Sequence, residues 1–203
     1  SFLRGWRLKD VIKRYSDFVP FPIEVAGEVA NTSKALWTMS KSQVTAEQHA
    51  EFYKHLTKNQ LGDAPLLTVQ LSVDAPVQYQ ALLYVPPKAP FDLFKQERES
   101  LRLYAKRVLI VESCDKLTPV WLRFLRGVVD SEDLSLNVSR EMLQENATLQ
   151  RIEQQLVKQV LKALGDLAKD DVEKYATFWK EFGRVLKEGV TLDWKNKDAI
   201  LDL

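Results

Sequence analysis

The sequence contains a single cysteine, Cys114, among its 203 residues. One cysteine cannot form an internal disulfide, so the chain fits a reducing compartment and we expect it to be cytoplasmic. The two histidines, His49 and His55, are six residues apart and would lie on different faces of a helix. Neither has a second ligand at metal spacing, so we assign no metal site. Cys114 has no histidine nearby, which argues against a nucleophilic role.

An excess of charge of one sign and long apolar runs are also missing. The 29 basic and 28 acidic side chains leave a formal net charge of +1, whereas a nucleic-acid-binding domain usually carries a clear positive surplus. No apolar run approaches the roughly 18 residues that a membrane-spanning helix needs. We therefore expect neither a nucleic-acid partner nor a membrane partner.

Glycine is scarce, and the 7 glycines are scattered, so the sequence has no Gly-rich phosphate loop. Any nucleotide pocket must therefore be supplied from outside this chain. The chain lacks an initiator Met and stops within the apolar pattern of residues 199–203. We expect it to be a piece of a longer protein.

Up to about residue 135 the sequence predicts strands and short helices. The alternation of Leu67 to Val73 predicts a strand, with an antiparallel partner over Tyr79 to Val85. The other predicted elements are a helix over Trp6–Tyr15, a short strand over Phe21–Val25, a polar connection over Gly27–Lys34, a helix to Leu56 after a capping box of Thr45 and Gln48, a central strand over Leu103–Val111, helical turns over Trp121–Leu125 and a short strand at Val128 and Val129.

Beyond that point the apolar period becomes 3.6 residues. One stripe runs from Leu149 to Leu167 and a second from Val172 to Leu186, with Asp170 or Asp171 as the cap between them and Gly189 as the stop. Two long helices joined by a short turn should pack antiparallel. The predicted fold is α/β: a mixed α+β sheet with flanking helices in αβα layers over residues 1–135, followed by an α-helical coil over residues 136–203.

Two stretches carry candidate functional residues. Arg140 and Gln144 are four residues apart, so in a helix both side chains would leave one face and could grip an anionic group. The structural alternative is a helix-start salt bridge of Arg140 with Glu141 or Glu145. Phe91, Leu93 and Phe94 lie in a Pro-rich loop that either folds onto its own core or offers an apolar patch to a partner. Trp37 has the same two interpretations, of which core packing is favoured.

Six sequence blocks resemble the middle domain of the ninety-kilodalton heat-shock chaperones, including the bacterial HtpG type. They are Trp6–Ser16, Ala35–Trp37, Glu51–Lys54, Ala89–Phe94, Trp121–Ser131 and Leu136–Gln144. The resemblance implies an ATP-hydrolysing chaperone in which an N-terminal domain binds ATP with Mg, this middle domain completes the site, and a C-terminal domain forms the homodimer. The chain alone is then expected to hold no cofactor and to be inactive.

The resemblance also implies roles for individual residues. Arg140 would reach the γ-phosphate of ATP on the neighbouring domain and Gln144 would support that contact, which makes these two the implied catalytic residues; Asn137 and Ser139 belong to the same loop. Trp37, Phe91, Leu93 and Phe94 would face unfolded or partly folded client proteins. The rival hypothesis is a non-catalytic protein-interaction scaffold in which Arg140 is only structural.

Overall fold

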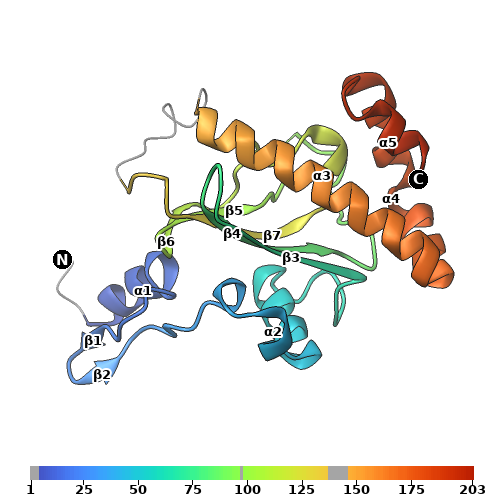
Figure 1. Cartoon of the computed structure of the whole chain (residues 1–203). Helices are drawn as coiled ribbons and strands as arrows, with labels where there is room; N and C mark the ends of the chain where they lie inside the picture. The colour runs from blue at the N-terminus through green and yellow to red at the C-terminus, as the bar shows by residue number, and fades with distance from the viewer. Residues whose placement is uncertain (1–4, 97, 137–145) are drawn as a thin grey trace.

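A five-stranded mixed sheet forms the middle layer of the protein (Figure 1). The computed structural model describes residues 5–96, 98–136 and 146–203. In spatial order the strands are β3 (Leu67–Val73), β4 (Tyr79–Val85), β7 (Arg126–Ser131), β5 (Arg102–Ala105) and β6 (Val108–Val111). Neighbouring strands are antiparallel except β7 and β5, which run parallel. The strands predicted at Leu67–Val73 and Tyr79–Val85 are confirmed, and the one predicted at Val128 and Val129 is confirmed as part of a longer, buried strand.

Helices cover both faces of this sheet, which confirms the αβα layering. The helix α2 (Ala46–Leu56) lies on one face, and α3 (Ala147–Asp170) and α4 (Val172–Leu192) lie on the other (Figure 1). Strand β4 shows why the chain folds this way: its alternate residues Ala81 and Leu83 belong to the core under α3 and α4, whereas Leu82 and Tyr84 belong to the core on the α2 side. A strand that is buried on both faces has a nearly continuous apolar sequence.

The helix α2 begins with the predicted capping box. The hydroxyl of Thr45 accepts a hydrogen bond from the Gln48 N–H at 3.3 Å, and the Gln48 side chain accepts one from the Thr45 N–H at 2.9 Å. These two bonds satisfy free donors at the start of the helix. The predicted helix to Leu56 is confirmed.

The N-terminal segment differs in part from expectation. The predicted helix is confirmed as α1 (Gly5–Tyr15), but the strand expected from Phe21 is only β1 (Glu24–Val25). Its partner β2 (Glu28–Val29) lies within the stretch predicted to be a polar connection. Ala26 and Gly27, with φ of 55° and 82°, make the tight turn that allows the pairing.

The prediction of one central strand over Leu103–Val111 is wrong. The chain reverses at Lys106 and Arg107, whose φ angles are 50° and 65°, and the two halves pair as the antiparallel hairpin of β5 and β6. Strand β6 is therefore at the edge of the sheet. A two-residue hairpin turn needs positive φ, which Gly and Asn usually provide, so Lys-Arg gave no turn signal.

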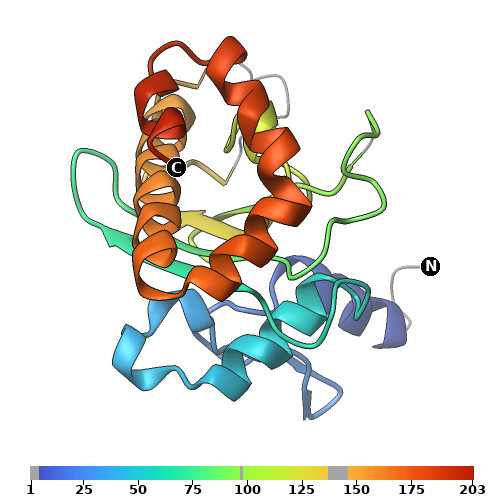
Figure 2. The ribbon, with the colours of Figure 1, turned by 90° about the vertical axis from the view of Figure 1, so that its right-hand side faces the viewer.

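The two long C-terminal helices meet at one residue. Asp171 ends α3 and caps α4, where its carboxylate accepts a hydrogen bond from the Lys174 N–H at 3.0 Å. Figure 2 shows α4 turning back from the end of α3, as the predicted helical hairpin requires, with the two helices diverging from this joint. A short helix, α5 (Lys197–Leu201), follows. None of the described helices is long and apolar enough to cross a membrane.

Gly189 does not stop the second helix, contrary to prediction, because α4 continues to Leu192. The glycine is buried where α4 meets the 3-10 helix η3 (Val120–Leu122). A Cβ atom at Gly189 would lie 2.8 Å from the Trp121 ring and 2.6 Å from the Ile200 side chain. The residue is small because two other elements pack closely against this part of the helix.

Candidate functional site

The loop after β4 exposes two phenylalanine rings, and a leucine that lies between them in the sequence is buried. Phe91 is 76% exposed and Phe94 is 62% exposed, whereas Leu93 is 1% exposed and belongs to the core under α3 and α4. Leu93 folds back onto the core, as the first interpretation of this loop has it. Phe91 and Phe94 are exposed, and we call these two residues the phenyl pair; their contact with a partner stays a prediction.

Buried polar groups anchor the backbone of this loop. The Asp92 carboxylate, which is almost fully buried, lies 3.2 Å from the Arg126 guanidinium and accepts a hydrogen bond from the Glu99 N–H at 2.8 Å. The Leu93 carbonyl accepts a hydrogen bond from Arg123 Nε at 2.7 Å. Because these groups are buried and hydrogen-bonded, the loop has a defined shape that holds both rings toward solvent.

Cations surround the phenyl pair. The guanidinium groups of Arg123 and Arg184 lie 5.3 Å and 5.1 Å from the centre of the Phe94 ring, and Lys95 Nζ lies 4.7 Å from the Phe91 ring. These distances are within the range of cation–π attraction. Both Nη atoms of Arg123 also donate hydrogen bonds to the Glu188 carboxylate, with Nη2 to Oε1 at 2.8 Å. This interaction lowers the pKa of the Glu188 carboxyl. The surface can accept apolar side chains, and its cations favour neighbouring acidic ones.

Trp37 lies in the core on the α2 side, with 1% of its surface exposed. Its ring packs against those of Phe18 and Tyr104, with centroid distances of 4.8 Å and 5.1 Å, and Nε1 donates a hydrogen bond to Asp130 Oδ2 at 2.9 Å. Burial raises the pKa of Asp130, while the hydrogen bonds from Trp37 and the Arg107 N–H lower it. In this conformation Trp37 supports the sheet and does not reach the surface.

The predicted phosphate-binding residues lie outside the described part of the chain. They are Asn137, Ser139, Arg140 and Gln144. On the far side of this segment, Asn146 caps α3, and its side-chain oxygen accepts hydrogen bonds from the N–H groups of Thr148 at 2.9 Å and Leu149 at 3.3 Å. The cap occupies these two donors, so they are not free to bind an anion.

Sequence reasoning missed the groups that hold and surround the phenyl pair. Asp92 lies in the loop itself, but its partner Arg126 comes from β7 and Arg184 comes from α4, so no local pattern links these two arginines to the loop. Within residues 5–96, 98–136 and 146–203, no three His, Cys, Asp or Glu side chains are grouped so as to hold a metal ion.

Comparison with known proteins gives a consistent result. A family model described as "Hsp90 protein" matches residues 24–203. The chain is similar to the Chaperone protein HtpG of Oleidesulfovibrio alaskensis, with 50% identity over 205 residues that cover 100% of this chain and 32% of that protein. The same-named proteins of Myxococcus xanthus and Nocardia farcinica are 45% and 42% identical, over 98% and 100% of this chain and 33% and 34% of their own lengths. The chain thus spans about a third of the length of these curated relatives. Because the family model and these relatives each match nearly the whole chain, the chain belongs to the Hsp90 protein family.

Proposed function

We propose that this chain is the middle domain of an ATP-dependent molecular chaperone and that its phenyl pair binds unfolded or partly folded client proteins. The relatives that it resembles are named chaperones. The observation that carries the client-binding part is the exposure of Phe91 and Phe94 on an anchored loop. Clustered exposed apolar side chains of this kind mark interaction sites.

The two other residues expected to face clients act indirectly in this proposal. Leu93 anchors the loop from inside the core, and Trp37 supports the opposite face of the sheet. The client surface is therefore Phe91 and Phe94 with the cations around them. An unfolded chain supplies apolar side chains for the rings and acidic side chains for Lys95 and Arg184, whereas Arg123 is already paired with Glu188.

Direct binding tests this surface. The double variant Phe91→Ser and Phe94→Ser should bind a fluorescently labelled, permanently unfolded protein more weakly than the wild-type chain does. Because both rings are exposed and three cation–π contacts are lost, the free energy of unfolding should fall by about 1.5–3 kcal/mol, and binding is compared under conditions in which both proteins are folded. Phe21→Ser is the matched control, since Phe21 is 59% exposed and lies outside the loop. Equal binding by the double variant and the control would remove the phenyl pair from the client site.

The second part of the proposal concerns Arg140. In the parent protein, Arg140 extends its guanidinium to the γ-phosphate of ATP held with Mg on the N-terminal domain, and Gln144 supports it from the same loop as Asn137 and Ser139. Family membership and the fit of a planar guanidinium fork to phosphate oxygens support this role. The partners are the protein's own N-terminal ATPase domain and C-terminal dimerisation domain, in a homodimer. The chain alone hydrolyses no ATP.

The scaffold alternative makes a different prediction for Arg140→Ala in the 203-residue chain. If the arginine only held the structure together, the variant would unfold at a clearly lower urea concentration. If Arg140 instead serves to contact the γ-phosphate of ATP, the variant should unfold at the same urea concentration as the wild type.

A further inference from the structure

Strand β3 leaves one long edge of the sheet open. It is at the end of the strand order and pairs only with β4 among the described strands. It is seven residues long, and its register with β4 runs from Leu67 to Val73 without a shift. The backbone N–H and C=O groups on the outer side of such a strand are available to pair with another extended chain.

The opposite edge of the sheet is different. Strand β6 has only four residues, its pairing with β5 has a register shift between Leu103 and Tyr104, and α1 lies against it. Short length, irregular pairing and a covering helix are the usual ways in which proteins prevent edge-to-edge pairing. These features protect β6, whereas β3 is long and regular, and although α3 and the 3-10 helix η1 (Leu36–Thr38) contact it, no second described strand pairs with its outer edge.

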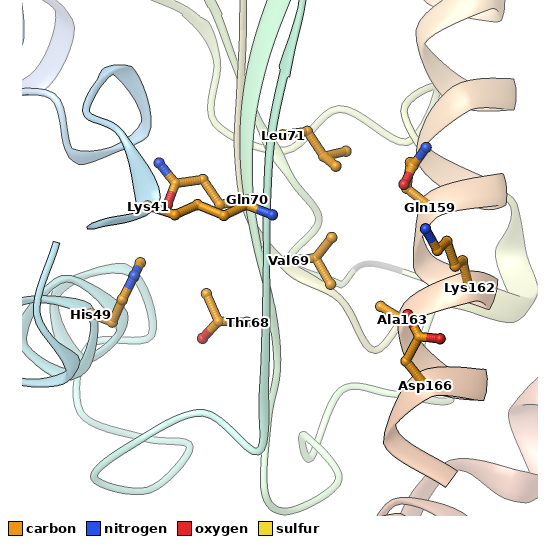
Figure 3. A pocket seen from close by; sticks show the side chains of 10 residues that line it. All are labelled: Lys41, His49, Thr68, Val69, Gln70, Leu71, Gln159, Lys162, Ala163 and Asp166. Atoms are coloured by element: carbon orange, nitrogen blue, oxygen red, sulfur yellow. The ribbon is translucent and has the colours of Figure 1, made fainter. Parts of the chain in front are cut away.

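A groove of about 370 Å³ runs along this open edge (Figure 3). Residues Thr68 to Leu71 form its floor. Lys41, from the 3-10 helix η2 (Lys41–Gln43), and His49 of α2 stand on one side, and Lys162 and Ala163 of α3 stand on the other. Four strand residues correspond to about 13 Å of edge. We call this site the edge groove.

The two faces of β3 in the edge groove differ. Val69 and Leu71 point toward α3, where Ala163 belongs to the same core and the polar side chains Gln159, Lys162 and Asp166 line the groove beside it. Thr68 and Gln70 point the other way, toward Lys41 and His49 (Figure 3). Because successive side chains of a strand point to opposite faces, an added strand fits if its apolar side chains face α3 and its polar ones face α2.

The α2 side of the edge groove also has a preference for charge. Lys41 is an exposed cation on this side, whereas Lys162 and Asp166, the one acidic side chain among the described residues that line the groove, both belong to α3. His49 Nδ1 lies 3.1 Å from the Tyr84 hydroxyl, and burial lowers the pKa of this histidine, so it is neutral at pH 7. Lys41 therefore favours acidic side chains on the polar face of the added strand.

Gln70 is held from the α2 side and leaves no accessible acceptor in the groove. Its Nε2 donates a hydrogen bond to the Met39 carbonyl at 2.7 Å. Its Oε1 is buried and has no donor among the residues that the structure describes. An added strand must therefore be bound through the backbone edge of β3 and the exposed side chains beside it.

We propose that the edge groove binds an extended segment of an unfolded client polypeptide, which pairs with β3 as an additional strand. The identity of the partner as a client rests on the proposed function, whereas the groove and its chemistry rest on β3 and its neighbours. The segment is an amphipathic strand in which apolar residues alternate with acidic or polar ones. Backbone pairing gives the affinity, and the alternation gives the selectivity.

The probe is a fluorescein-labelled decapeptide in which valine alternates with glutamate and threonine. We expect the wild-type 203-residue chain to bind it and amide hydrogen exchange to slow in residues 67–73. Two N-methylated forms of the peptide, methylated at the odd or at the even residues, separate strand pairing from a side-chain contact. Each form lacks the donors of one edge, so one form should lose binding and the other should keep it.

Charge reversal adds a matched pair of variants. Lys41→Glu should weaken binding of the acidic peptide roughly 1.4- to 5-fold, as expected for one exposed charge pair. A peptide with lysine in place of glutamate should recover binding to this variant. Lys180→Glu changes one exposed charge on α4, outside the groove, and should have no effect.

Several outcomes would overturn the proposal: no binding of the peptide, equal binding of both N-methylated forms, or protection from exchange in residues 91–94 instead of 67–73. Protection of residues 67–73 that grows with protein concentration, without peptide, would show that a second copy of the chain occupies the edge. If a Phe91→Ser and Phe94→Ser variant binds the peptide normally, peptide binding by the edge groove is supported even when the phenyl pair proves not to bind clients.

Discussion

Replacing Trp37 with phenylalanine separates a core role of this residue from direct client contact. The change keeps an aromatic ring among Phe18 and Tyr104 but removes the Nε1–H that donates to Asp130 at 2.9 Å. A hydrogen bond to a charged group contributes about 1.5–3 kcal/mol. The smaller ring adds up to about 1.5 kcal/mol. We expect Trp37→Phe to lower the free energy of unfolding by about 1.5–4.5 kcal/mol at pH 7.

This loss should depend on pH because of Asp130. Burial raises its pKa in the folded state above the unfolded value of about 3.9, and loss of the Trp37 hydrogen bond raises it further. A carboxyl with a raised folded pKa favours the folded state when protonated, so its contribution to stability is lost as pH rises through that pKa. The variant should therefore lose more stability than the wild type between pH 4 and pH 7. At pH 4 the gap should be smaller by about 1 kcal/mol, since a neutral hydrogen bond is roughly half as strong as a charged one.

Urea unfolding of both proteins across this pH range measures the effect. In an Asp130→Asn background, Trp37→Phe should cost less, and its cost should not change with pH. A loss below about 1 kcal/mol that is independent of pH would refute the reasoning. Weaker binding of unfolded protein by a variant of unchanged stability would show instead that Trp37 contacts the client.

Three further predictions concern the supports of the two proposed sites. Asp92→Ala leaves the buried Arg126 without its partner and should cost about 3–5 kcal/mol, whereas Lys58→Ala, which breaks an exposed pair with a glutamate, should cost less than about 1 kcal/mol; urea unfolding compares them. Asn146→Ala removes the cap of α3 and should cost about 1 kcal/mol in the same assay, and an unchanged midpoint would argue against the cap. Gly127→Ala, at φ of 143° with its new Cβ only 2.2 Å from a carbonyl oxygen of β4, should cost at least about 2 kcal/mol; a neutral result in thermal unfolding would contradict the close packing of β4 and β7.

The sequence predicts those elements of the fold whose signals are local. Alternation placed β3, and the capping box placed the start of α2, because each pattern reflects contacts within a few residues. The β5–β6 hairpin was missed because Lys106 and Arg107 adopt positive φ without a residue type that announces it. Gly189 was misread because its role comes from packing against Trp121, more than sixty residues away, and not from the end of a helix.

The candidate site shows the same division. Phe91 and Phe94 were predicted as candidate contacts, but a loop without a regular period gives no sign that Leu93 between them turns inward. The cation from Arg184 reaches Phe94 only because α4 folds back over the sheet. The edge groove also depends on the strand order, since β3 becomes an edge only when β7 pairs on the far side of β4. Tertiary arrangement of this kind is not encoded in any one stretch of sequence.

The most direct test of the proposed function is steady-state ATP turnover by the full-length parent protein, wild type against Arg140→Ala, with ATP affinity measured on the same samples. The account predicts unchanged affinity and reduced turnover, by as much as roughly 10³- to 10⁵-fold if the arginine acts as arginines do at their strongest in phosphoryl transfer. Equal turnover by the two proteins would contradict a role for Arg140 at the γ-phosphate and would leave binding of partner proteins as the function of this chain.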